Sequence, residues 1–237
     1  MKTIGFRDVV NVVAYRATLM ALKVRIALQR FLGRQNDYQP DPFGSIPPVT
    51  STTRQSQDRF DAIQAFLPNG PISIIDVGCN DGYFVLKLAT QGGICIGIDQ
   101  DRNSIMIGQA RAAINGVPNA LFANLTITPE NAANLPRVDV VICLSVFHHW
   151  VRHFGIERAN IVLDELGGKA GKVLVFETGQ PNEIGAQWAG LLSFMGGDPD
   201  VWIHDRLVTM GFDQVHPVGK YSTTVTDVPR TLFVGIR

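Results

Sequence analysis

The stretch "ISIIDVGCNDGYF" at residues 72–84 decides the fold. An apolar, β-favouring run ends on Asp76, a short glycine-containing loop follows, and aromatic and apolar residues then resume. This order predicts a buried strand over 72–76 and a helix over 83–91. Because ligands of open α/β sheets bind beyond the carboxyl ends of the strands, we expect Asp76 to lie at a binding edge.

The loop between this strand and helix has Gly78 and Gly82 with Asn80 between them. Glycine adopts positive φ freely and lets the backbone approach a ligand, and asparagine tolerates left-handed geometry better than most residues. A glycine-rich loop that opens onto a helix is typical of nucleotide binding. A tight turn with no ligand is the alternative interpretation.

Outward from this stretch, apolar runs of strand length alternate with segments of helical periodicity. This alternation predicts an α/β fold with a mostly parallel sheet covered on both faces, and the last two runs suggest a closing hairpin. Strands are expected at 72–76, 94–99, 121–122, 139–144, 172–177, 213–218 and 230–236, and helices at 53–66, 83–91, 104–115, 156–166, 184–195 and 199–211.

The second expected strand ends on Asp99, 17 residues after Gly82. An acid at this place accepts hydrogen bonds from both hydroxyls of a ribose, although a helix cap is the simpler role for Asp99 alone. The first loop lacks both the G-x-G-x-x-G pattern of dinucleotide folds and the G-x-x-x-x-G-K-[ST] pattern of triphosphate loops. The two acids and the glycine loop together predict a different adenosine ligand.

The chain has 237 residues, of which 46% are hydrophobic and 18% are charged, with a formal net charge of zero. The length suits one large domain with a small accessory piece, and the composition is globular. Zero net charge gives no global sign of a nucleic-acid partner. Cys79, Cys95 and Cys143 sit in or beside apolar runs without metal-binding spacing, which indicates reduced thiols in a cytoplasmic protein.

Residues 1–34 carry a net charge of +6, since seven lysines and arginines stand against one acid, Asp8. Apolar residues at helical spacing predict one or two amphipathic helices over 5–32. Such a helix suits packing on its own domain or in a homodimer, and it equally suits peripheral contact with an anionic membrane surface. The Pro- and Gly-rich residues 35–52 predict a linker.

Four motifs resemble the successive motifs of class I S-adenosyl-L-methionine-dependent methyltransferases: "DVGCNDGYF", "GIDQD", "NLPRVDVVICLSVFHHW" and "GKVLVFET". The resemblance covers residues 54–237. It implies a Rossmann-like, seven-stranded sheet with the last strand antiparallel, in a methyltransferase domain over 53–237 preceded by a basic helical extension and linker over 1–52. Asn80 departs from the pattern, because the family most often has glycine there.

More narrowly, "LSVFHHW" followed by "GIERANIVLDEL" resembles methyltransferases that cap or modify mannose-containing polysaccharides. These include the O-antigen chain-terminating type and the mycobacterial sugar O-methyltransferases of methylmannose polysaccharide synthesis. The resemblance implies O-methylation of a saccharide hydroxyl in polysaccharide biosynthesis, with S-adenosyl-L-homocysteine as the second product.

The family resemblance also implies which residues hold the cofactor. Asp76 to Gly82 would surround its methionine end, Asp99 would take the ribose hydroxyls, and Asn124 would bond the adenine edge, although the family often has aspartate at that place. Arg54 or Arg59 would pair with the methionine carboxylate, unless both are simply exposed to solvent. The implied cofactor-binding residues are Asp76, Gly78, Cys79, Asn80, Gly82, Tyr83, Asp99, Gln100, Asn124, Leu125, Cys143 and Ser145.

The histidines of "FHHWVRHF" follow the fourth strand, on the side expected for the methyl acceptor. A hydroxyl acceptor must lose a proton, and a histidine suits that task. Neighbouring residues do not share a helix face, so His149 is the favoured base and His148 the second choice. An acceptor that needs no base, with two structural histidines, is the alternative. His153 and Trp150 are expected to contact the acceptor.

The segment "FETGQPNE" places oxygen-bearing side chains beside the same mouth. Glu177 and Gln180 are expected to bind sugar hydroxyls or to orient a histidine. A magnesium ion is a secondary possibility, since no spacing fixes a set of ligands and we expect no metal. The segment over 185–205 is expected to form part of the acceptor wall, to act as a lid, or to be an ordinary packed helix.

Other functions fit parts of this pattern. A methyltransferase of RNA or of an RNA 5′ phosphate would need a basic face near the site, whereas the basic excess lies in the N-terminal helix. A small-molecule natural-product methyltransferase is a further enzyme hypothesis. A cofactor-binding scaffold without catalysis is the non-enzyme hypothesis, and the intact motifs disfavour it.

Overall fold

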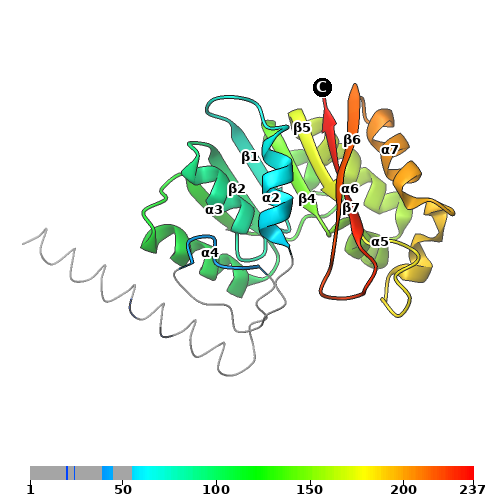
Figure 1. The fold of residues 1–237 in the computed structure, drawn as a ribbon, viewed down its shortest axis with the longest axis horizontal. Helices are drawn as coiled ribbons and strands as arrows, with labels where there is room; N and C mark the ends of the chain where they lie inside the picture. Colours follow the sequence, from blue (N-terminus) through cyan, green and yellow to red (C-terminus); the bar gives the residue numbers. More distant parts are fainter. Residues whose placement is uncertain (1–19, 21–23, 25–38, 45–54) are drawn as a thin grey trace, which may run out of the picture.

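The computed structural model describes residues 20, 24, 39–44 and 55–237 (Figure 1). Over this part of the chain, seven strands form one sheet in the order β3-β2-β1-β4-β5-β7-β6. Strand β7 runs antiparallel to both β5 and β6, and the other neighbouring pairs are parallel. The predicted seven-stranded sheet with an antiparallel last strand is confirmed. The strands are β1 (Ser73–Val77), β2 (Ile94–Asp99), β3 (Ala120–Asn124), β4 (Val138–Leu144), β5 (Ala170–Glu177), β6 (Gln214–Tyr221) and β7 (Arg230–Ile236).

Helices cover both faces of the sheet, and alternate strand residues face the two layers. On one face, Ile74 and Val140 pack against α2, α3 and α4. On the other face, Ile75 and Val141 pack against α5, α6 and α7. The helices are α2 (Ser56–Gln64), α3 (Tyr83–Thr90), α4 (Arg102–Ile114), α5 (Phe147–Phe154), α6 (Ile156–Lys169) and α7 (Pro199–Thr209), with short 3₁₀ turns η1 (Ala132–Asn134) and η2 (Ala189–Met195).

Side-chain caps fix where two helices begin. Asp101 accepts hydrogen bonds from the backbone amides of Asn103 and Ser104, so α4 begins at Arg102, two residues before the start expected from its periodicity. Asp198 caps α7, and Pro199 occupies its first turn, where a missing N–H costs nothing.

Two elements differ from the sequence-based expectation. The segment over 147–154, expected only as a site-bearing stretch, forms the separate helix α5, which ends at Gly155 with φ of 81°. The expected helix over 184–195 is instead irregular chain followed by the 3₁₀ turn η2. Gly185 and Gly196, both at positive φ, bound this stretch and interrupt a regular helix.

The predicted basic amphipathic helix lies almost wholly outside the described residues. Met20 and Val24 are described there, and both are helical and exposed. Residues 39–44 belong to the expected linker and lie against the domain, because Gln39 accepts a hydrogen bond from the Tyr83 amide. Among the helices that the structure describes, we find none with the length and apolarity to cross a membrane.

Candidate active site

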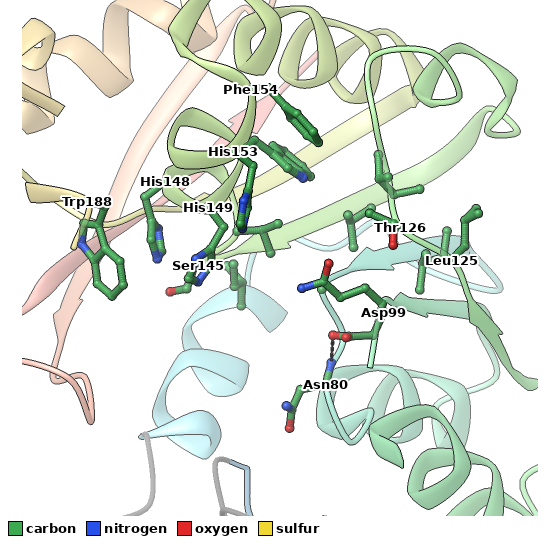
Figure 2. A pocket seen from close by; sticks show the side chains of 18 of the residues that line it. Asn80, Asp99, Leu125, Thr126, Ser145, His148, His149, His153, Phe154 and Trp188 are labelled. Atoms are coloured by element: carbon green, nitrogen blue, oxygen red, sulfur yellow. Dashed lines mark hydrogen bonds between the residues drawn. The ribbon is translucent and has the colours of Figure 1, made fainter. Parts of the chain in front are cut away.

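A cavity of about 750 Å³ opens at the carboxyl ends of β1, β2 and β4. The strand order reverses between β1 and β4, and such a switch point is where open α/β sheets bind ligands. Figure 2 shows two groups of side chains that face each other across it. We call the first group the loop wall: Gly78, Asn80, Asp99, Gln100, Leu125 and Thr126. We call the second group the histidine wall: Ser145, His148, His149, His153, Phe154 and Trp188.

The glycine loop of the loop wall has the geometry expected from its sequence. Gly78 lies at φ of 75° and Asn80 at φ of 50°, both in the left-handed region. A Cβ at Gly78 would come within 2.2 Å of the Val146 side chain, so only glycine lets the loop pack against the end of β4. At Gly82, a Cβ would come within 2.4 Å of the Phe122 ring. The glycines therefore serve packing as well as any approach to a ligand.

Asp99 lies at the centre of the loop wall (Figure 2). Its carboxylate accepts hydrogen bonds from the amides of Asn80 (2.9 Å) and Asp101 (2.8 Å). Burial raises the pKa of Asp99 above its ordinary value, and these amide donors oppose that rise. The alternative role of Asp99 as the cap of the following helix is wrong, because Asp101 performs it.

The end of β3 completes the loop wall. Leu125 lines the cavity, and its amide donates to the Asp99 carbonyl at 3.0 Å. Asn124 is not among the residues that line the cavity, and its side-chain amide donates to the backbone carbonyls of Asp99 (3.0 Å) and Gln100 (2.9 Å). Asn124 thus ties β3 to the end of β2, whereas the sequence suggested a ligand contact.

Three expected cofactor contacts have side chains turned into the protein. Tyr83 is 2% exposed, donates its hydroxyl to Gln57 Oε1 at 2.6 Å, and has a pKa raised by burial to about 12. Cys79 and Cys143 are fully buried, and burial raises the pKa of each thiol. Any contact of these three residues with a ligand of the main cavity is left to their backbone atoms.

Asp76 lies beneath the loop beside a much smaller second cavity of about 10 Å³, whose lining it shares with Gln39, Arg59 and Gly78. Arg59 is 1% exposed, so the alternative of a solvent-exposed arginine is wrong for this residue. Its Nε donates to Glu177 Oε2 at 2.8 Å. Arg54, the other expected partner of a ligand carboxylate, lies outside the described residues.

Helix α5 supplies the pair at the centre of the histidine wall. His148 is 1% exposed, whereas His149 is half-buried, and their ring centroids lie 4.3 Å apart. Burial lowers the pKa of His149, and the positive charge of Arg230 adds to this effect. His149 is therefore neutral at pH 7, with a ring nitrogen able to accept a proton.

Trp188, which the sequence did not single out, closes the histidine wall. Its ring lies 4.3 Å from that of His148 and 5.4 Å from that of His149. Its Nε1–H donates to Glu183 at 3.3 Å, and the Arg230 guanidinium lies 5.4 Å from its ring centroid. Trp188 thus reaches the cavity from the loop after β5, in the segment expected to form an acceptor wall.

A buried network of hydrogen-bonded side chains supports the histidine wall. Arg230 donates through Nε and Nη2 to Glu183 (2.7 and 2.6 Å) and through Nη1 to Ser145 Oγ (2.9 Å). Ser145 Oγ donates to Glu177 Oε1 at 2.7 Å, and Glu177 Oε2 accepts from Arg59. Glu177 and Gln180 were expected to contact the acceptor, but both are buried and neither lines the main cavity of the described structure. The Glu177 carboxylate accepts from Arg59 and Ser145, and the backbone amide of Gln180 donates to Glu183 Oε1 at 2.8 Å.

The other expected acceptor contacts reach the cavity. His153 is exposed on α5, and Trp150, which is 6% exposed, also lines it. Across the part of the chain that the structure describes, no three histidines, cysteines or carboxylates gather in a way that could hold a metal ion.

Residues 75–168 match the family model described as "Methyltransferase domain". The chain carries a methyltransferase domain. It is 36% identical over 97 residues to the O-antigen chain terminator bifunctional methyltransferase/kinase WbdD of Escherichia coli. That match covers 40% of this chain and 14% of WbdD, so the similarity concerns a small part of the larger protein.

A second curated relative and two solved structures give further comparisons. The ubiquinone biosynthesis O-methyltransferase of Serratia proteamaculans is 28% identical over 96 residues, which is 40% of this chain and 39% of that protein. A solved structure of WbdD superposes with a TM-score of 0.64 and 27% identity, covering 76% of this chain and 39% of that one. Magnesium protoporphyrin IX methyltransferase from Synechocystis PCC 6803 shares the fold, with a TM-score of 0.56, 22% identity, and coverage of 76% and 82%.

Proposed function

We propose that this chain is an S-adenosyl-L-methionine-dependent O-methyltransferase that acts on a saccharide hydroxyl, with His149 as general base. The observation that carries the proposal is that one and the same cavity holds the loop wall, with Gly78 and Asp99, and the neutral ring of His149. The buried free thiols favour a reducing, cytoplasmic setting.

The loop wall fits S-adenosyl-L-methionine. The Asp99 carboxylate faces the cavity and keeps acceptor capacity for ribose hydroxyls beyond its two amide donors. Leu125 offers an apolar surface for the adenine, and Gly78 lines the same cavity, where the methionine end would lie. The volume of about 750 Å³ lies within the roughly 300–1,000 Å³ typical of small-molecule sites. The structure of the Synechocystis enzyme with bound S-adenosylhomocysteine supports the same choice.

When bound, S-adenosyl-L-methionine supplies an electrophilic methyl group on a positively charged sulfur. His149 accepts the hydroxyl proton on a ring nitrogen while the acceptor oxygen forms its bond to the methyl carbon, which leaves S-adenosyl-L-homocysteine. The imidazolium then releases the proton to solvent. Trp188 and Phe154 place aromatic surface beside the histidine. Holding the acceptor oxygen in line with the methyl group contributes on the order of 7–11 kcal/mol.

The saccharide acceptor is the finer part of the proposal. It is supported by the similarity to the O-antigen chain terminator WbdD and by the aromatic residues Trp150, Phe154 and Trp188, which suit the apolar face of a sugar ring. His153 adds a polar group at the same edge of the cavity.

The test is a methyl-transfer assay with methyl-labelled S-adenosyl-L-methionine and a panel of mannosides, other oligosaccharides, small phenols and a short RNA. We expect label to enter mannosides or related saccharides, with stoichiometric release of S-adenosyl-L-homocysteine. Transfer confined to phenols or RNA would reject the saccharide assignment. Intact cofactor binding without transfer to any acceptor would favour the scaffold hypothesis.

A further inference from the structure

The two histidines of α5 differ in what their nitrogens contact. The backbone N–H of Gly179 donates to His148 Nδ1 at 2.9 Å, and Thr178 Oγ1 lies 3.3 Å from the same nitrogen. A backbone amide is always a donor, so His148 Nδ1 must present a lone pair. The neutral His148 ring therefore carries its proton on Nε2.

Gly179 permits this contact because a glycine has no Cβ. A Cβ at this position would come within 2.6 Å of Trp188 Nε1 and within 3.0 Å of His148 Cγ. The absence of a Cβ lets the backbone after β5 approach the imidazole ring edge while Trp188 packs over both. The glycine, the histidine and the tryptophan thus form one packed unit next to His149.

A base must offer a lone pair to the acceptor, and His148 has none to offer. Its Nδ1 is used by Gly179, and its Nε2 already holds the proton. Protonation of Nδ1 would bring two N–H groups together in a site that is 1% exposed. His149 differs, because its ring is half-buried and borders the open cavity.

We propose that His148 is a positioning residue held in its Nε2–H tautomer by the Gly179 amide, so that His149 alone accepts the proton from the acceptor. The proposal deepens the proposed function and relies on it for the role of His149, but the tautomer itself does not depend on catalysis. In this arrangement His148 joins α5 to the loop after β5 and fixes the distance between His149 and Trp188.

Charged groups around the pair come from several elements. Arg152 and His153 lie on α5 with the pair itself, Glu183 follows β5, and Arg230 begins β7. Arg230 is paired with Glu183, and its residual field disfavours a positive charge on His149. Burial together with Arg230, His153 and Arg152 lowers the pKa of His149. The tautomer of the His148 ring is decided by the Gly179 contact.

The first test is a long-range ¹H–¹⁵N NMR spectrum of the histidine side chains of the full chain, titrated from pH 8 to pH 5. One histidine is expected to keep an unprotonated Nδ1 and a protonated Nε2 through the titration, and His148→Asn should remove its signals. Nδ1 protonation of that residue near pH 6.5 would overturn the proposal. This readout needs no acceptor, so it stands or falls separately from the methyltransferase assignment.

The second test is the pH profile of kcat/KM in matched variants. Asparagine places an oxygen near the position of Nδ1, so His148→Asn should keep the Gly179 contact and the acidic limb of the wild-type profile. His149→Asn should lose that limb together with roughly 10²–10⁴-fold of the rate. An acidic limb that disappears in His148→Asn but persists in His149→Asn would reverse the two roles.

Discussion

The two walls of the cavity are built in different ways. The loop wall comes from consecutive strand ends, and its central contacts use backbone amides, as between Asn80 and Asp99. The histidine wall is held by side chains from distant segments, since Arg230 reaches Glu183 across 47 positions and Ser145 across 85. The comparison suggests that the loop wall determines what binds, and that the histidine wall determines what reacts.

The largest effect should come from His149→Ala. Loss of the base should lower kcat by roughly 10²–10⁴-fold. Because His149 lies on the histidine wall, affinity for S-adenosyl-L-homocysteine should stay within a factor of about three, which corresponds to well under 1 kcal/mol. Steady-state kinetics and calorimetry on the same preparation check both expectations, and a parallel loss of affinity would mean that the walls are not separable.

Breaking the support of the histidine wall should affect folding. Arg230→Met leaves Glu183 buried without its cation, which typically costs about 3–5 kcal/mol. Urea unfolding should show this as a large fall in the midpoint. The control is Arg206→Met, which removes an arginine whose partner Asp164 is half exposed and should cost no more than about 1 kcal/mol. Equal losses of unfolding free energy in the two variants would contradict a supporting role for the buried hydrogen-bond network.

Asp99→Ala should weaken cofactor binding while sparing the chemistry at saturation. Hydrogen bonds to a charged group contribute about 1.5–3 kcal/mol, so affinity should fall by roughly 10- to 100-fold. Asp213→Ala, at an exposed position, is the matched control. The measurement is the KM for S-adenosyl-L-methionine together with kcat. A loss confined to kcat would contradict the assignment of Asp99 to cofactor binding.

The smallest effect is expected at Gln39, which joins the segment over 39–44 to the loop wall. Its Oε1 accepts from the Tyr83 amide at the start of α3, and it lines the small cavity beside Asp76. Gln39→Ala should cost about 0.5–2 kcal/mol of stability, as loss of a helix cap does. Gln64→Ala on the exposed face of α2 is the control, and thermal unfolding of both variants is the measurement.

Much of the fold and of the loop wall could be predicted because their signals are local. The run over 72–76, the glycines around Asn80 and the acid at Asp99 lie within 28 residues of sequence and act through backbone geometry. The family resemblance supplied the strand count and the antiparallel β7. Helix α5 was not predicted, because the sequence marked residues 147–154 only as a site-bearing stretch and the expected helix began after Gly155.

The histidine wall was less predictable because its contacts join distant segments. Glu177 sits at a strand end beside the cavity, yet Arg59 and Ser145 use its carboxylate within the protein. Trp188 lay in a segment expected to be a helix, and its importance depends on Glu183 and Arg230, which no spacing rule connects. The residue types of Trp188 and Arg230 were visible in the sequence, but they did not show which way either side chain points.

The most direct test of the separation between the two walls is calorimetric titration of S-adenosyl-L-homocysteine into the wild-type chain, Asp99→Ala and His149→Ala side by side. We expect micromolar binding by the wild type and by His149→Ala, and a loss of roughly 10- to 100-fold in Asp99→Ala. No binding by the folded wild type, or equal binding by all three proteins, would contradict the assignment of the loop wall to this cofactor.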